Sequence, residues 1–97
     1  MRRDQLYDLI EAAATAIQQD TVIVIGSQAI LASLPDRDLP RRAVMSPEAD
    51  MIPFRDDERG TFADILDGAI GELSPFDLEN HVYARTRGSL LRHVAPR

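Results

Sequence analysis

The chain has 97 residues, of which 44% are hydrophobic and 28% are charged, and this composition is typical of one small globular domain. Its net charge of −5 disfavours general binding to a nucleic acid backbone, because such binding depends on neutralising phosphates. The absence of cysteine excludes a disulfide framework and a thiolate zinc site, and no apolar run approaches the roughly 20 residues that cross a membrane.

The first quarter of the chain predicts a helix followed by a strand. Apolar residues recur at helical spacing over residues 4–19, and Asp4 is a suitable N-cap. These residues are Leu6, Leu9, Ile10, Ala13, Ala14 and Ile17. The β-branched run Thr21–Ile25 lies between Asp20 and Gly26, which is typical of a buried strand. We expect this strand to be central in its sheet.

A second, shorter helix is predicted directly after a glycine-serine turn. Residues 27–34 have helical spacing and stop at Pro35, so the helix N-terminus lies on the turn formed by Gly26 and Ser27. Residues 35–42 are polar and bounded by prolines, which indicates a surface loop. Residues 43–54 are predicted to be extended, with a bulge or a sheet edge at Pro47.

The second half predicts one helix and then weaker strands. Thr61 is a suitable N-cap for a helix that reaches Leu73 and ends at Ser74 and Pro75. Two glycines inside it, at positions 68 and 71, indicate close packing against another element. Residues 81–84 and 89–94 are predicted strands on either side of a glycine at position 88.

Two carboxylates and one glycine turn carry the strongest chemical signal. Glu48 and Asp50 project from the same side of a strand, because side chains alternate with a period of two. Such a pair can share a hard divalent cation whose other ligands are water and a substrate phosphate. Gly26 lets a ligand approach the backbone, and a helix start favours an anion. The combination predicts a phosphoryl or nucleotidyl transfer site, although each part alone is common on an ordinary strand or helix cap.

Three segments resemble a known family. Residues 24–30 (VIGSQAI) and 46–51 (SPEADM) are similar to the first two motifs of nucleotidyltransferase-fold proteins, a glycine-serine turn and then acidic-x-Asp. Residues 63–76 (ADILDGAIGELSPF) resemble a segment of the bacterial DUF6036 family of nucleotidyltransferase-like proteins, whose relatives include AbiEii-type toxins of toxin–antitoxin systems. The resemblance spans about residues 22–88. It implies an α/β domain with a small mixed sheet flanked by helices, over residues 1–97.

The resemblance also implies roles for named residues. Gly26 and Ser27 would contact the phosphates of a nucleoside triphosphate, and Glu48 and Asp50 would hold Mg²⁺ as catalytic carboxylates. The implied reaction is nucleotidyl transfer to a protein or RNA hydroxyl. Independently of the resemblance, Arg41 and Arg42 precede the carboxylate strand and could clamp a phosphate, although a solvated loop pair is the favoured interpretation.

The chain also departs from the family pattern. The first acidic position is Glu48 where many active transferases have Asp. The third carboxylate, expected from a later strand as the general base, is not found. Asp77 and Glu79 are the only late candidates before Val82, and we interpret them as surface residues of a turn. Similar family members continue well beyond residue 97, so a C-terminally truncated member is also predicted.

Two alternatives to an active transferase stay open. The chain could be a catalytically inactive interaction module, antitoxin-like or a remnant, that binds a protein partner, or a fragment that folds only in part. His81 and His93 are too isolated for a recognisable metal pattern. The basic tail, with arginines at positions 85, 87, 92 and 97, favours contact with an acidic protein surface over RNA. We expect a cytoplasmic protein that forms a homo-oligomer, because its core is small.

Overall fold

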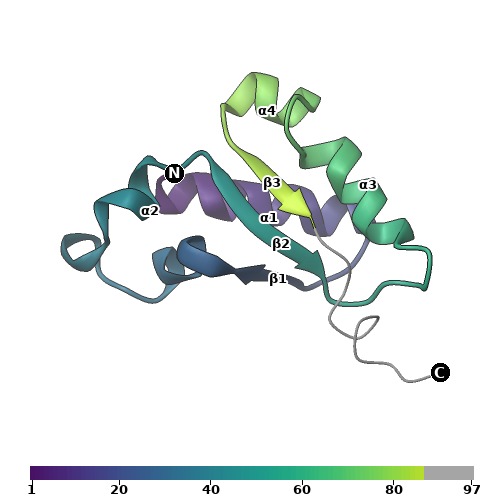
Figure 1. The fold of residues 1–97 in the computed structure, drawn as a ribbon, viewed down its shortest axis with the longest axis horizontal. Coiled ribbons are helices and arrows are strands. Elements are labelled where there is room, and N and C mark those ends of the chain that lie inside the picture. The colour runs from purple at the N-terminus through teal and green to yellow at the C-terminus, as the bar shows by residue number, and fades with distance from the viewer. Residues whose placement is uncertain (87–97) are drawn as a thin grey trace.

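Three strands form one mixed sheet with helices packed on one of its faces (Figure 1). The computed structural model describes residues 1–86, except the side chains of Ser27, Ala32, Asp36 and Arg42. The elements in chain order are α1 (Arg3–Ile17), β1 (Val22–Ile25), the 3₁₀ helices η1 (Gly26–Ala32) and η2 (Asp36–Asp38), α2 (Arg41–Met45), β2 (Glu48–Pro53), α3 (Thr61–Ile70), α4 (Pro75–Asn80) and β3 (Tyr83–Thr86). The predicted α/β class, with a small mixed sheet and flanking helices, is therefore confirmed. Among residues 1–86, no helix has the length and apolar character needed to cross a membrane.

The strand order is β1-β2-β3, so β2 is the central strand. β1 runs antiparallel to β2, and Ile25 pairs with Asp50. β3 runs parallel to β2, and Glu48 pairs with Tyr83 while Asp50 pairs with Arg85. The parallel pairing is possible because α3 and α4 form the long crossover that parallel strands require.

The expected central position of the Val22–Ile25 strand is wrong. β1 lies at an edge of the sheet and its residues are only half-buried. Pro47 does not mark a sheet edge either, because it lies just before the central strand β2 and accepts a hydrogen bond from the Tyr83 N–H at 3.0 Å. Its missing N–H therefore falls outside the strand ladder, where proline is tolerated.

The core lies between α1, α3 and one face of the sheet. The helical spacing predicted in α1 is confirmed, since Leu6, Leu9, Ala13 and Ile17 are all buried. They pack in one cluster with residues of the sheet and of α3, namely Ala49, Met51, Ala84, Leu66 and Ile70. Figure 1 shows α1 running behind the sheet, and no helix of the described residues crosses the front of the strands. We call the front of the sheet, the side of Glu48 and Asp50, the open face because no described helix crosses it, although Ile52 on this side is 1% exposed.

Helix boundaries differ from the predicted ones because other groups cap the helices. Arg2, not Asp4, is the N-cap of α1, and the Gln5 side chain accepts the Arg2 N–H at 2.7 Å. Thr61 is the first residue of α3, not its N-cap. The free N–H groups of that first turn are satisfied from the preceding loop: Asp57 accepts the Thr61 N–H at 2.9 Å, and the neighbouring Asp56 accepts the next one.

The two glycines of the predicted 61–73 helix do not mark a close helix contact. A Cβ at Gly68 would meet nothing within 4 Å. Gly71 is the C-cap of α3, where a Cβ would lie 2.3 Å from the Asp67 carbonyl oxygen of the same helix. Leu73, placed by spacing on the buried side, is 75% exposed because the helix has already ended.

Two short helices replace segments predicted as loop, extended chain or turn. α2 covers part of the predicted loop and extended run, and the Met1 ammonium donates to the carbonyls of Ala43 at 3.1 Å and Val44 at 2.7 Å. α4 follows Ser74, whose hydroxyl accepts the Asp77 N–H at 3.2 Å. The predicted strand at 81–84 is found as β3, two residues later, and the predicted strand at 89–94 lies outside the described residues.

Candidate functional site

Glu48 and Asp50 lie on the open face of β2, as the alternation of side chains predicts. Both are partly buried, whereas Ala49 between them and Met51 after them are fully buried in the core on the other side. The sequence therefore placed the two carboxylates correctly on one face of a strand.

The glycine turn and the second carboxylate come together. Ile25 pairs with Asp50 across the sheet, and Gly26 follows directly with φ +79°. A Cβ at Gly26 would lie 3.6 Å from Asp50 Oδ2, an ordinary contact distance. The positive φ, rather than lack of space, is therefore the reason why glycine suits this position.

The helix after the turn is a 3₁₀ helix rather than the expected α-helix. Ser27 is its second residue, and the positions of the Ser27 and Arg42 side chains lie outside the described part of the structure. Seven residues of 3₁₀ helix give a weaker N-terminal dipole than a full α-helix would. The anion-binding contribution of this helix start is thus smaller than the sequence pattern suggested.

Gln28 is a residue of this region that sequence reasoning missed. Its side chain is 2% exposed and its Nε2 donates to the Ala43 carbonyl at 2.9 Å. The contact ties η1, which carries the glycine turn, to α2 next to the carboxylate strand. A glutamine after a glycine-serine turn gives no signal in a single sequence, so only the three-dimensional structure could reveal this role.

Glu48 has two partners on β3. The Tyr83 hydroxyl donates to Glu48 Oε2 at 3.1 Å, and Arg85 Nη1 lies 3.8 Å from Glu48 Oε1. Burial raises the pKa of the Tyr83 hydroxyl, and the hydrogen bond and negative charge of Glu48 raise it further. Ser46 fixes the start of the strand by accepting the Glu48 N–H at 3.2 Å.

The strand beside the carboxylate pair presents an arginine rather than a third carboxylate. Arg85 pairs with Asp50 in the register of β2 and β3. Within residues 1–86, no group of three or more His, Asp or Glu side chains is placed to hold a metal ion. The sequence alone could not reveal that Arg85 faces the pair, because the register of two strands separated by two helices is not encoded locally.

The other late candidates lie elsewhere. Asp77 Oδ2 accepts the Leu73 N–H at 2.8 Å, so Asp77 stabilises the start of α4, which was predicted to be a turn. Glu79 is exposed on α4 and borders a hollow with Phe76, not the open face of the sheet. His81 ends α4 with φ +63°.

The two carboxylates of the open face are of the chemical kind that Mg²⁺ prefers, and water and phosphate would have to complete its coordination. Two carboxylates separated by one residue provide the oxygen ligands that Mg²⁺ prefers. The Arg85 guanidinium opposes binding of the free ion, because it already supplies positive charge 3.8 Å from Glu48.

No protein-family model matches this chain, and no curated protein or solved structure matches it either. The resemblance to nucleotidyltransferase-like proteins therefore stays a prediction. In the structure, its three segments correspond to the end of β1 with η1, to β2, and to α3 with the start of α4.

Proposed function

We propose that the chain binds a nucleoside triphosphate with Mg²⁺ on the open face of the sheet. The observation that carries the proposal is the approach of the Gly26 turn to Asp50, with 3.6 Å between a Cβ built on Gly26 and Asp50 Oδ2. Glu48 and Asp50 would hold Mg²⁺, which when bound supplies charge neutralisation for the phosphates. The turn, including the Ser27 backbone, would allow the phosphates close to the main chain.

Transfer of a nucleotidyl group to a protein or RNA hydroxyl is the further part of the proposal, and it rests on the resemblance alone. It requires a general base, and among the described residues no third carboxylate is grouped with Glu48 and Asp50 so as to hold a metal ion. Arg42 as a phosphate ligand, a toxin–antitoxin role, a cytoplasmic location and homo-oligomerisation likewise rest on the sequence.

The second candidate function is an inactive interaction module of the same fold that binds a protein partner. The observation in its favour is Arg85, which faces Asp50 and lies 3.8 Å from Glu48. The positive charge of Arg85 offsets part of the negative charge of Glu48 and Asp50 without a metal ion. A third carboxylate in the place of this arginine would instead strengthen metal binding.

Calorimetric titration separates the two candidates. ATP, CTP, GTP and UTP would each be titrated with Mg²⁺ into the wild type and into the double variant Glu48→Gln, Asp50→Asn. We expect affinity for at least one nucleotide to fall by about tenfold or more, because hydrogen bonds and ligand contacts of charged groups are worth roughly 1.5–3 kcal/mol.

A matched control variant carries the same change in net charge elsewhere. Asp20→Asn with Asp38→Asn likewise removes two carboxylates, which are exposed and lie outside the three strands, and this variant should bind as the wild type does. Circular dichroism would establish that every variant is folded. Absence of binding by folded wild type would refute nucleotide binding and favour the interaction module.

A further inference from the structure

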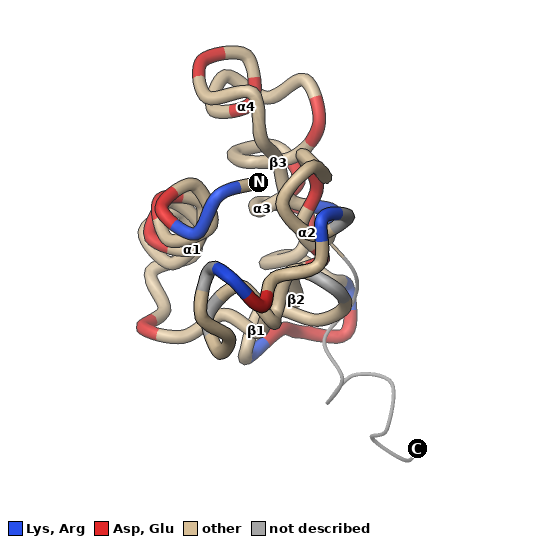
Figure 2. The backbone as a smooth tube through the Cα atoms, turned by 90° about the vertical axis from the view of Figure 1, so that its left-hand side faces the viewer, with Lys and Arg blue, Asp and Glu red and all other residues tan. Residues whose placement is uncertain are grey.

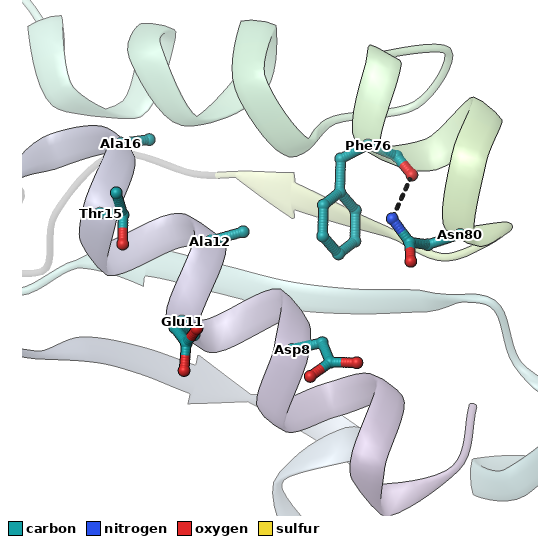
Figure 3. Close-up of a pocket in the computed structure, with 7 residues that line it drawn as sticks. All are labelled: Asp8, Glu11, Ala12, Thr15, Ala16, Phe76 and Asn80. Atoms are coloured by element: carbon teal, nitrogen blue, oxygen red, sulfur yellow. Dashed lines mark hydrogen bonds between the residues drawn. The ribbon is translucent and has the colours of Figure 1, made fainter.

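The helical side of the molecule has a groove that the proposed function does not use. It lies between α1 and α4 and has a volume of about 490 Å³ (Figure 3). A second hollow of about 190 Å³ shares Asp8, Phe76 and Asn80 with it and continues to Gln5 and Glu79. Together they follow α1 from Gln5 to Ala16, a helix length of about 16 Å.

The floor of the groove is apolar. The Phe76 ring points from α4 toward α1, where Ala12 and Ala16 face it across the groove (Figure 3). Both alanines and Phe76 are only half-buried. Because the alanine side chains are small, they leave the Phe76 ring partly uncovered. Asn80 Nδ2 donates to the Phe76 carbonyl at 3.0 Å, which fixes the α4 side of the groove. The floor therefore offers a preformed contact for an apolar side chain.

The rim of the groove is acidic. Asp8 and Glu11 are exposed on α1, and Glu79 is exposed on α4. Arg2 reaches the far end, but its guanidinium is paired with Asp4 at 3.1 Å.

The residues around the groove are also negatively charged. Residues 60–84 contain five acidic residues and no arginine or lysine, and Figure 2 shows acidic and no basic positions along α4. The five are Asp64, Asp67, Glu72, Asp77 and Glu79. This negative charge favours a basic peptide segment as the ligand of the groove, because it would attract such a segment and repel an acidic peptide or a nucleic acid.

We infer that the groove binds a basic peptide segment of a partner protein, with arginine or lysine at the rim and an apolar side chain on the floor. Cationic side chains pair with Asp8 and Glu11, and a guanidinium can also lie over the Phe76 ring. The apolar side chain fills the space between the Phe76 ring and the two alanines. The inference does not depend on nucleotide binding, since none of these residues belongs to the open face of the sheet.

The test uses two synthetic peptides on the ¹⁵N-labelled protein. One repeats Arg-Leu-Ala and the other repeats Glu-Leu-Ala. We expect only the arginine peptide to bind, and its amide shift changes to centre on residues 8–16 and 76–80. In Asp8→Asn with Glu11→Gln, affinity should fall about fivefold, as expected for two partly screened ion pairs. The wild-type affinity should also fall with added salt.

Asp20→Asn with Asp38→Asn changes net charge by the same amount outside the groove and should bind as the wild type does. Equal binding of both peptides, equal loss in the control variant, or shift changes elsewhere would each overturn the inference. Concentration-dependent self-association that Asp8→Asn with Glu11→Gln abolishes would also overturn it, because the groove would then belong to a second copy of this chain.

Discussion

The open face of the sheet and the groove between α1 and α4 both carry carboxylates, but they differ in what lies beside them. Glu48 contacts the Tyr83 hydroxyl and lies 3.8 Å from the Arg85 guanidinium. Asp8 and Glu11 border an apolar floor on a side of the molecule that is otherwise acidic. On the first surface one cation partly balances two carboxylates, whereas the arginine that reaches the groove, Arg2, is paired with Asp4 and leaves Asp8 and Glu11 to attract a cation.

The largest expected effect is that of a substitution at Gly26, which should alter the open face of the sheet but not the groove. Gly26→Ala should lower the free energy of unfolding by about 1–2 kcal/mol, because an L-residue at positive φ is disfavoured. Urea denaturation measures this loss. Nucleotide binding should weaken, while binding of the arginine peptide to the folded variant should not change.

Gly68→Ala is the matched control for that substitution. Gly68 lies within α3, and an added Cβ there meets nothing within 4 Å. It should therefore raise stability by about 0.5–1 kcal/mol. If Gly26→Ala raised stability as Gly68→Ala does, the backbone of the turn would not require glycine.

A smaller effect is expected from removing the arginine beside the carboxylates of the open face. Arg85→Gln removes the cation beside Glu48 and Asp50, so their affinity for Mn²⁺ alone should rise about fivefold, the range expected for an exposed charge pair. Electron paramagnetic resonance of free Mn²⁺ measures it without nucleotide. Arg37→Gln, which removes an exposed arginine in η2, should have no effect. Equal Mn²⁺ affinity in wild type and Arg85→Gln would contradict the charge balance described for this face.

The smallest effect concerns the Tyr83 hydroxyl. In Glu48→Gln, the pKa of Tyr83 should fall toward its ordinary value of about 10, although burial still holds it up. Because folding raises this pKa, its contribution to stability is present below about pH 10 and is lost as pH rises through the raised value. The loss should therefore begin at the same pH in the variant, but it should be smaller and be complete at a lower pH.

Phenolate absorbance in a Tyr7→Phe background follows Tyr83 alone, since the chain has two tyrosines. An unchanged titration of Tyr83 in Glu48→Gln would mean that the 3.1 Å hydrogen bond does not persist in solution.

The features that the sequence predicted well are those encoded by local periodicity. The spacing of Leu6, Leu9, Ala13 and Ile17 identified the buried side of α1. The alternation in β2 placed Glu48 and Asp50 together, away from the core. In each case the pattern of one element decides which side chains are buried, without reference to any other element.

The features that the sequence did not predict depend on contacts between distant segments. β1 has the composition of a central strand, yet β3 joins the other side of β2 and leaves β1 at the edge. α2 has only five residues, too few for a periodic signal, and is held by the Met1 ammonium and Gln28. Arg85 faces Asp50 only because of the register between β2 and β3. Ser27 and Arg42, predicted as phosphate ligands, stay predictions because their side chains are not described.

The edge position of β1 has a consequence for handling the protein in concentrated solution. Val22, Ile23, Val24 and Ile25 are all β-branched, and in the described structure the strand has β2 as its one neighbour. An uncharged β-branched strand at a sheet edge is a template for pairing with other chains and can start aggregation. A lysine at a half-exposed β1 position should therefore improve solubility more than the same change on a helix surface.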